Sequence, residues 1–266
     1  MNTGQTSQKA PIDEAPRAFV YPRVDSTMDT ARTLDESLEY GPLNDWETIF
    51  AESQTSGRGQ LRREWHSPKG NIYATLMLPT IFSYAANDKD QRNYTDLLPL
   101  IAGYLLCSAL EKHGFDILVK WPNDILLQGR KVGGILVEQR GDKTYCGIGL
   151  NLCHAPSDEQ MRADAAMPAG TMINFNQKSP RDTWLTLVNS MKKEYLSLFK
   201  FTNLTEFVIL VSQRLAWMGQ NVLVHESESI TYQGTLVGLA ENGALLIDKA
   251  GQTIELTCGS ILPLRR

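Results

Sequence analysis

The hydrophobic and polar positions of residues 1–216 alternate between short apolar runs and longer segments with helical spacing. Short apolar runs bounded by turn residues indicate strands, and apolar residues three or four apart indicate helices. The pattern predicts strands at 48–53, 72–78, 116–121, 124–127, 131–139 and 144–152. It predicts helices at 24–41, 96–114, 181–199 and 204–217. Turns such as "QGRK" and "RGDK" join the later strands directly, so we expect an α+β fold with a mixed, mainly antiparallel sheet rather than a doubly wound parallel sheet.

The first predicted helix has a polar start and an apolar face. Asp25 and Ser26 are typical helix caps, and Gly41 is a typical stop. The apolar residues at helical spacing between them are Met28, Ala31, Leu34 and Leu38. We therefore expect these four side chains to pack against the rest of the body.

The character of the chain changes at about Met218. Short β-rich segments separated by turns occupy 220–226, 230–239, 243–248 and 252–261. About fifty residues with this pattern fit a small β-barrel. The predicted division is a flexible tail at 1–17, a body at 18–216 and a β-barrel domain at 217–266, with a polar surface insertion at 81–96 and an irregular loop at 153–170.

Composition places the chain among soluble globular proteins. Its 266 residues are 42% hydrophobic and 21% charged, and the net charge of −4 argues against general nucleic-acid binding. No apolar run reaches membrane-spanning length, and the first sixteen residues lack the apolar stretch of a secretory signal. The four cysteines show no metal-binding spacing. We therefore expect reduced thiols in a cytoplasmic protein with neither DNA nor membrane as a partner.

A basic, glycine-bearing loop contrasts with this acidic background. The stretch "SGRGQLRREWHSPKGN" at 56–71 carries Arg58, Arg62, Arg63 and Lys69. Glycine lets backbone N–H groups approach an anion, and arginine adds charge-assisted hydrogen bonds. The stretch matches neither the P-loop nor the dinucleotide-binding pattern. We interpret it as an anion-binding loop; the alternative is a solvated turn between two strands.

Two further stretches combine glycine with polar residues on strands. "VKWPNDILLQGRKVGGILVEQ" at 119–139 carries Asn123 and Asp124 on a hairpin whose returning strand begins with Lys131. Strand glycines commonly mark the close approach of a ligand or another backbone, although "PND" alone fits an ordinary turn and "KVGG" a β-bulge. "CGIGLNLC" at 146–153 is a second glycine-bearing strand.

These stretches, in this order, resemble the motifs of biotin protein ligases. The matching segments are "GRGQLRREWHSPKGNIY", "KWPNDILL…RKVGGILVE" and "GIGLNL", preceded by "DSTMDTA" and "AESQTSGRG". The resemblance covers about 21–151, and the β-rich end is similar to the SH3-like C-terminal domain of the family. It implies a class II synthetase-like biotin/lipoate ligase catalytic fold followed by a small SH3-like β-barrel. Only about twenty residues precede "DST", so we expect the form without an N-terminal DNA-binding domain.

The resemblance implies an ATP-dependent ligase. Such enzymes convert biotin and ATP to biotinyl-5′-AMP and pyrophosphate, then pass the biotinyl group to a lysine of a biotin carboxyl-carrier domain of acetyl-CoA carboxylase or another biotin-dependent carboxylase. ATP with Mg²⁺ is the implied co-substrate, and a homodimer is left open. The main alternative is a lipoate or octanoate ligase of the same fold. A non-catalytic module that binds biotin or a nucleotide is a second alternative, and a nucleic-acid-binding protein that uses the basic loop is a third.

The resemblance also assigns site residues. The positions implied to bind biotin are Ser26, Thr27, Gln54, Gly57, Arg58, Gly59, Tyr73, Lys131, Gly134, Leu136 and Gly147. Those implied to bind ATP are Arg58, Gln60, Arg63, Trp65, Asn123, Lys131 and Asn151, with Trp65 stacking on adenine. Lys131, Arg58 and Asp124 are implied to act in catalysis, and Asp124 is also a candidate magnesium ligand. Two positions depart from the family pattern: Gln60 stands where arginine is common, and Met28 where asparagine is common.

Overall fold

The computed structural model describes residues 17–79, 97–157, 159, 167–172, 178–201 and 203–264. The expected tail up to residue 16, the insertion at 81–96, most of 158–166 and the side chain of Arg62 lie outside the described residues. Among the described residues, no helix combines the length and hydropathy needed to cross a bilayer.

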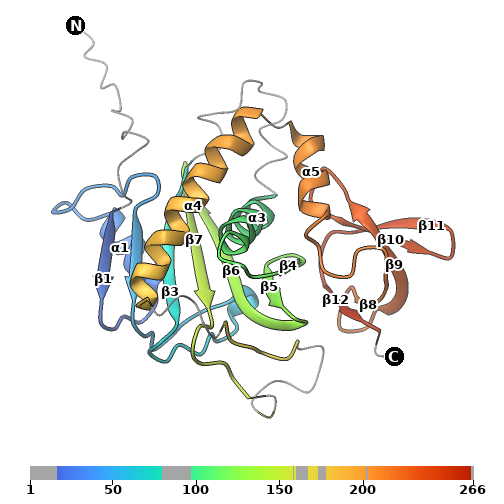
Figure 1. Cartoon of the computed structure of the whole chain (residues 1–266), viewed down its shortest axis with the longest axis horizontal. Coiled ribbons are helices and arrows are strands. Elements are labelled where there is room, and N and C mark those ends of the chain that lie inside the picture. Colours follow the sequence, from blue (N-terminus) through green and yellow to red (C-terminus); the bar gives the residue numbers. More distant parts are fainter. Residues whose placement is uncertain are drawn as a thin grey trace, which may run out of the picture.

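The body is built on a seven-stranded sheet (Figure 1). Its strands are β1 (Ala18–Tyr21), β2 (Thr48–Ala51), β3 (Ile72–Leu78), β4 (Ile117–Lys120), β5 (Asp124–Leu127), β6 (Arg130–Arg140) and β7 (Lys143–Leu150). Their spatial order is β1-β2-β3-β7-β6-β5-β4. Every neighbouring pair is antiparallel except β1 and β2, which confirms the mainly antiparallel sheet. Strand β1 was not predicted: its four residues are too few to show a period, and only the pairing with β2 makes it a strand.

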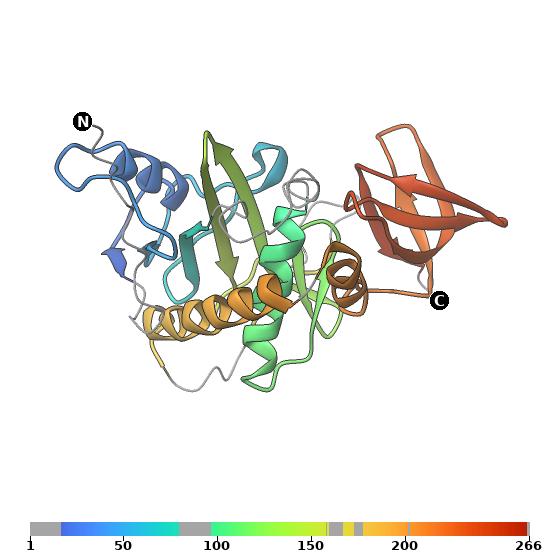
Figure 2. The same cartoon turned by 90° about the horizontal axis from the view of Figure 1, so that it is seen from above.

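Helices cover the two faces of this sheet unequally (Figures 1 and 2). On one face, α3 (Leu98–Glu111) packs over β4, β5 and β6, whereas α4 (Pro180–Phe201) packs beside α3 and contacts β3. Helix α5 (Leu204–Ser212) contacts α3 as well. Because α3 packs on both sides, nearly all of its side chains are buried. On the other face, the short helix α1 (Thr27–Asp35) packs over β2, β3 and β7.

Alternation along the strands separates these two faces. On β3, Ile72, Ala74 and Leu76 belong to the main core under α3 and α4, whereas Met77 belongs to a smaller core under α1. Thr75, two positions before Met77 and on the same face, hydrogen bonds to Thr27 of α1. Thr75 therefore shares the α1 face with Gly147, where a Cβ would meet Met28 of α1.

The C-terminal residues form a separate five-stranded antiparallel sheet. Its strands are β8 (Asn221–His225), β9 (Thr231–Leu239), β10 (Leu245–Lys249), β11 (Gln252–Leu256) and β12 (Ser260–Pro263), in the order β11-β10-β9-β8-β12. This arrangement is consistent with the predicted SH3-like domain. The domain boundary at 217 stays a prediction, since the apolar core runs on from the body into the barrel.

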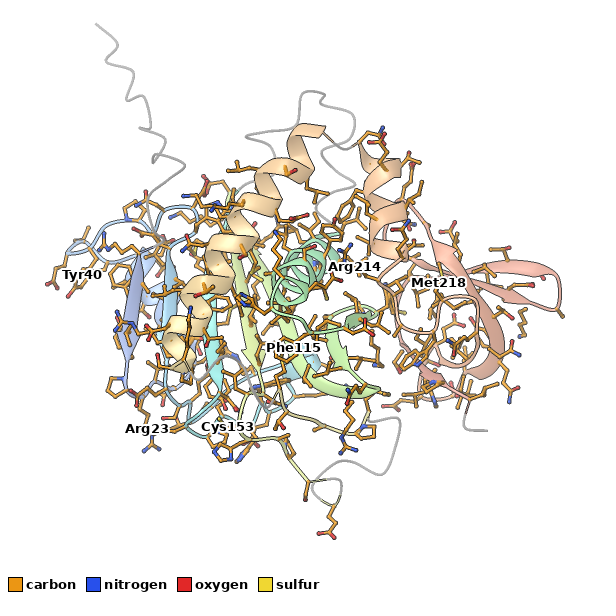
Figure 3. The ribbon with its side chains drawn as sticks, in the orientation of Figure 1. Arg23, Tyr40, Phe115, Cys153, Arg214 and Met218 are labelled. Carbon is orange, nitrogen blue, oxygen red and sulfur yellow. The ribbon has the colours of Figure 1, made fainter. Side chains whose placement is uncertain are left out.

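Two contacts fix the barrel against the body. The Trp121 indole donates a hydrogen bond to the Gly243 carbonyl oxygen at 2.9 Å. The Thr205 hydroxyl of α5 donates to the Glu241 carboxylate of the barrel at 2.8 Å. On the body side, Arg214, just after α5, makes two hydrogen bonds to Glu111 at the end of α3. Figure 3 labels Arg214 on the body side of this junction and Met218 on the barrel side.

The predicted ends of two helices were wrong. Helix α1 ends at Asp35, because the Asp35 carboxylate accepts hydrogen bonds from Lys143, Tyr145 and the Leu43 backbone and so directs the chain away from the helix axis. Leu38 is consequently fully exposed and does not belong to the apolar face. Ser26 occupies the N-cap position, but its side chain makes no capping hydrogen bond.

Helix α5 ends at Ser212 instead of continuing to 217. The chain after it pairs with the edge of β4, where the Val119 N–H donates to the Arg214 carbonyl and the Ala216 N–H donates to the Val119 carbonyl. A tertiary strand contact thus replaces the last helical turn that the apolar spacing predicted.

Candidate active site

The floor of the candidate site is a glycine-lined part of strands β6 and β7. Gly134 pairs with Gly149, and Leu136 pairs with Gly147. The Trp65 indole lies directly on the first pair: a Cβ on Gly149 would stand 2.6 Å from the ring and a Cβ on Gly134 2.9 Å from it. Only glycine leaves room for a flat ring this close to the sheet.

The Trp65 indole nitrogen has an unusual environment. Its Nε1 is buried, and no hydrogen-bond partner for it is present among the described residues. Buried polar groups nearly always have partners, so this donor faces a place where an acceptor is expected. Trp65 was predicted to stack on adenine, and its position against the site floor is compatible with contact to a flat ligand.

Asp124 lies between two lysines at the edge of this floor. Its carboxylate oxygens stand 2.5 Å from Lys131 Nζ and 3.2 Å from Lys120 Nζ. Burial pushes the pKa of the Asp124 carboxyl up, but the charges and hydrogen bonds of Lys131 and Lys120 outweigh burial and hold that pKa below its ordinary value. Lys131 Nζ also lies 5.2 Å from the centroid of the Trp65 ring. Lys131, Asp124 and Trp65 therefore form one cluster, to which the stretches 56–71 and 119–139 both contribute.

The basic loop folds as a small hairpin. The Trp65 N–H donates to the Gly57 carbonyl and the Gly59 N–H to the Arg63 carbonyl, both at 2.8 Å. Gly57 is enclosed, since a Cβ there would meet the Trp65 carbonyl at 2.5 Å. The tip is a 3₁₀ turn at Gln60–Arg62. Its middle residue, Leu61, has a left-handed φ of 56° and a side chain that is 82% exposed, so the tip projects into solvent.

The arginines of this hairpin differ in their contacts. Arg58 forms a two-pronged ion pair with Asp29 of α1, at 2.8 Å for each prong. The Arg63 side chain is exposed. The sequence interpretation did not include Asp29, whose only signal is an acidic residue in the first turn of the helix.

Polar side chains at the start of α1 form a wall beside the floor. Gln54 Oε1 accepts hydrogen bonds from the Thr27 backbone at 2.8 Å and the Thr27 hydroxyl at 3.2 Å. Gln54 Nε2 donates to Ser67 at 3.0 Å, and Thr75 donates to Thr27 at 3.0 Å. Ser26 is buried next to them. The predicted pair of Thr27 and Gln54 is thus brought together, and Ser67 and Thr75 were missed.

Three other predicted residues are engaged by the protein itself. Asn123 Nδ2 donates to the Ile135 carbonyl at 2.6 Å, and Asn151 Nδ2 donates to the Gly170 carbonyl at 3.2 Å. The Tyr73 hydroxyl donates to the Pro68 carbonyl at 2.8 Å, and burial raises the pKa of Tyr73 well above its ordinary value. These contacts hold the loops around the site, and direct ligand contacts by the three residues stay predictions.

Asn71 is a structural residue that the sequence interpretation missed. Its Oδ1 accepts hydrogen bonds from the backbone N–H groups of Leu152, Cys153 and His154 at 2.9–3.0 Å. It thereby ties the end of the basic loop to the chain that leaves β7. The signal was available, since Asn71 stands in the quoted "SPKGN".

A cleft of about 510 Å³ lies beside the start of β6. It is lined by Leu127, Gln128, Arg130, Val132, Cys153, His154, Ala155, Ala169, Gly170 and Thr171. Hydrogen bonds from the Lys131 N–H to the Pro168 carbonyl and from the Gly170 N–H to the Lys131 carbonyl form one wall. The cleft therefore adjoins the Lys131 cluster through the backbone of β6.

The described residues do not provide a preformed magnesium site. No cluster of three metal-binding side chains occurs among them. Both oxygens of Asp124 already accept lysine ammonium groups, so a metal ion there would have to displace a lysine.

Comparison with known proteins identifies the family of the chain. Residues 20–152, half of the chain, match the model of the biotin/lipoate A/B protein ligase family. A "Biotin--[acetyl-CoA-carboxylase] ligase" of Paracoccus denitrificans is 27% identical over 82% of this chain and 91% of that protein. The "Bifunctional ligase/repressor BirA" of Bacillus subtilis is 27% identical over 84% of this chain and 66% of that protein.

Solved structures agree with the sequence matches. The biotin protein ligase from Aquifex aeolicus in complex with biotin and ATP superimposes with a TM-score of 0.70 at 25% identity, over 92% of this chain and 97% of that one. The Leishmania major enzyme in complex with biotinyl-5-AMP superimposes with a TM-score of 0.62 at 25% identity, over 91% and 98%. The matched residues 20–152 contain the Lys131 cluster, the basic hairpin and the glycine floor, and this chain belongs to the biotin/lipoate A/B protein ligase family.

Proposed function

We propose that this chain activates biotin with ATP to biotinyl-5′-AMP and transfers the biotinyl group to a lysine of a carrier domain. One observation carries the proposal: Lys131, the Arg58 hairpin and Trp65 converge on a glycine-lined floor beside the Thr27–Gln54 wall. This arrangement offers cations for phosphate, a flat apolar surface, and amide and hydroxyl groups for a polar ring. The relatives named as biotin ligases favour biotin over lipoate.

The first step brings two anions together. A biotin carboxylate oxygen attacks the α-phosphorus of ATP, the bond to the bridging oxygen of the β-phosphate breaks, and pyrophosphate leaves. Negative charge accumulates as the anions approach, and cations fixed in advance lower the barrier. Lys131 is positioned for this by Asp124, and Arg58 lies on the hairpin that faces the same floor. Mg²⁺ is the usual metal for ATP use, and it would arrive with the nucleotide phosphates.

The second step consumes the mixed anhydride. The uncharged amine of the carrier lysine attacks the biotinyl carbonyl carbon, the bond to the phosphate oxygen breaks, AMP leaves, and the amide nitrogen releases its surplus proton to water. The lowered pKa of Asp124 makes it a poor base, so we assign it to attract and orient the incoming lysine rather than to remove its proton. The Thr27–Gln54 wall would hold the ureido ring of biotin, and Trp65 would shield the anhydride from water.

The substrate test is acid-dependent exchange of labelled pyrophosphate into ATP. Biotin, lipoate and octanoate are supplied one at a time with ATP and Mg²⁺, and we expect exchange with biotin alone. Exchange driven by lipoate or octanoate instead would replace the proposal with a ligase for that acid. The absence of exchange with any acid would leave a binding module.

The acceptor test uses a biotin carboxyl-carrier domain from a biotin-dependent carboxylase. Incubation with biotin, ATP and Mg²⁺ should attach biotin to the wild-type domain and leave a lysine-to-arginine version unmodified. Equal labelling of both versions would show untargeted release of the activated acid.

A further inference from the structure

The ion pair between Arg58 and Asp29 occupies the anion-binding edge of Arg58. Arg58 Nη1 and Nη2 each lie 2.8 Å from a different oxygen of the Asp29 carboxylate. A carboxylate and a phosphate use the same two parallel hydrogen bonds to a guanidinium. A phosphate can therefore take this edge of Arg58 only by displacing Asp29.

Asp29 keeps an ion-pair partner when Arg58 moves away from it. Its carboxylate also contacts Arg32, one helical turn further along α1, and Arg32 in turn pairs with Glu138 on β6. Arg32 is mostly buried, so this second pair is fixed by the body rather than by the hairpin. Displacement of Asp29 from Arg58 thus exchanges one charge pair for another without stranding a charge.

We propose that Asp29 is an internal competitor for the anion that Arg58 binds, and that it sets the affinity of the hairpin for phosphate. Asp29 acts through Arg58 and is a positioning residue rather than a catalytic one. A single carboxylate offers Arg58 nothing that Asp29 does not already supply. A multiply charged polyphosphate attracts Arg58 more strongly than a single carboxylate does, and it can therefore displace Asp29 from Arg58. Since this rests on the proposed function, Arg58 should join the site when the nucleotide arrives, and the acid alone should not recruit it.

The hairpin geometry makes such an exchange feasible. The base of the hairpin is held by the Trp65 ring on Gly134 and Gly149 and by the hydrogen bond from the Ser56 N–H to the Asp25 carbonyl, whereas its tip at Gln60–Arg62 projects into solvent. Arg58 and Asp29 are both about two-fifths exposed, at 36% and 43%. Pairs this exposed contribute little to folding, so exchange at Arg58 does not require unfolding of the body.

Direct binding of inorganic pyrophosphate, measured by calorimetry on the full chain, tests the proposal. We expect Asp29→Asn to bind pyrophosphate about two- to fivefold more tightly than wild type at low salt, the range expected for releasing an exposed pair. The gain should shrink toward none at high salt, where the wild-type pair is already screened. Asp29→Glu, which keeps the charge, should stay close to wild type.

Glu52→Gln is the matched control. Glu52 forms an exposed ion pair with Lys69 at 2.8 Å at the base of the same loop, so its removal changes the net charge equally but frees no arginine of the hairpin. It should leave pyrophosphate affinity unchanged. An equal gain in affinity in Glu52→Gln would mean that the change in net charge alone explains the effect. Weaker pyrophosphate binding by Asp29→Asn would mean that Asp29 helps the hairpin to bind the anion. Either result overturns the proposal.

Two precautions keep the test decisive. If Asp29→Asn does not fold, Asp29→Ser removes the same charge with a residue tolerated in a first helical turn, and the same tighter binding is expected. Pyrophosphate binding does not depend on the identity of the acid, so failure of biotin-dependent exchange would remove the proposed function and leave the Asp29 result standing. Wild-type exchange with unchanged pyrophosphate affinity in both Asp29→Asn and Asp29→Ser would remove this inference alone.

Discussion

The two faces of the seven-stranded sheet use the same strands for opposite purposes. On β6 and β7, Ile135, Cys146 and Ile148 point into the core under α3 and α4. One residue away, Gly134 and Gly149 form the floor under Trp65. Large apolar side chains pack on the core face, whereas glycines on the site face leave space above the strands. Because successive side chains of a strand point to opposite faces, apolar residues on one face can anchor the strand in the core while glycines on the other face leave room for a ligand.

The cluster of Asp124, Lys120 and Lys131 distinguishes the site from the apolar core face, and Asp124→Asn tests how much this cluster contributes to stability. The variant leaves two buried or half-buried lysines without their carboxylate, so we expect the free energy of unfolding near neutral pH to fall by about 3–5 kcal/mol. Denaturant titration measures this fall. An unchanged or higher free energy of unfolding in Asp124→Asn would mean that the pairing of Asp124 with the two lysines does not stabilise the fold.

The same variant predicts a pH dependence. Because the folded-state pKa of Asp124 lies below its ordinary value, the carboxylate stabilises the fold above about pH 4, and this contribution disappears as the pH falls through the folded-state pKa. Wild type and Asp124→Asn should therefore converge in stability at acid pH. A constant gap between them down to acid pH would contradict the lowered pKa.

Lys131→Ala and Ile135→Ala separate chemistry from packing on one strand. Removing Lys131 takes away a cation at the reacting groups, and we expect pyrophosphate exchange to fall about a hundredfold or more. Ile135 is buried in the core, so its truncation should cost about 2–5 kcal/mol of stability. Its exchange rate per folded molecule should stay near normal. Near-normal exchange by Lys131→Ala would remove Lys131 from the mechanism.

Two adjacent glycines sharpen the comparison further. A Cβ on Gly133 would meet Leu150 at 2.5 Å and the Gly149 carbonyl at 3.0 Å, so Gly133→Ala should destabilise the fold by about 1–3 kcal/mol. A Cβ on Gly134 would meet the Trp65 ring instead. Gly134→Ala should therefore change stability less and weaken ligand binding more. Thermal unfolding and biotin affinity are measured on both variants. Equal losses of stability and of biotin affinity in the two variants would contradict this distinction.

The smallest effect is expected at the tip of the hairpin. Gln60 lacks the charge of the arginine common at this position, and a charge-assisted hydrogen bond there adds about 1–2 kcal/mol. We expect Gln60→Arg to slow the dissociation of biotinyl-AMP by about five- to thirtyfold and to reduce stray labelling of a bystander protein. Unchanged retention in Gln60→Arg, together with loss of retention in Arg62→Ala, would assign the role to Arg62 instead.

The sequence predicted which stretches lie together around Lys131 better than it predicted where helices end. The basic loop, the Lys131 strand and the second glycine strand were each recognisable, because close approach and charge demand particular residue types. Leu38 shows the limit: its spacing continued the apolar face of α1, but Asp35 finds partners on β7 and turns the chain before Leu38 is reached. Those partners lie more than a hundred residues away, beyond any local pattern.

The sequence by itself determined the family, the antiparallel α+β body, the β-rich C-terminal module and the side chains gathered around Lys131. Each of these follows from local periodicity or from residue types that the chemistry requires. The tertiary structure alone decided that β1 is a strand, that Lys131 and Lys120 share one carboxylate, and that Asp29 holds Arg58. The reason is physical: charge pairing and strand pairing act between segments far apart in the chain, and only folding sets which partners come within reach.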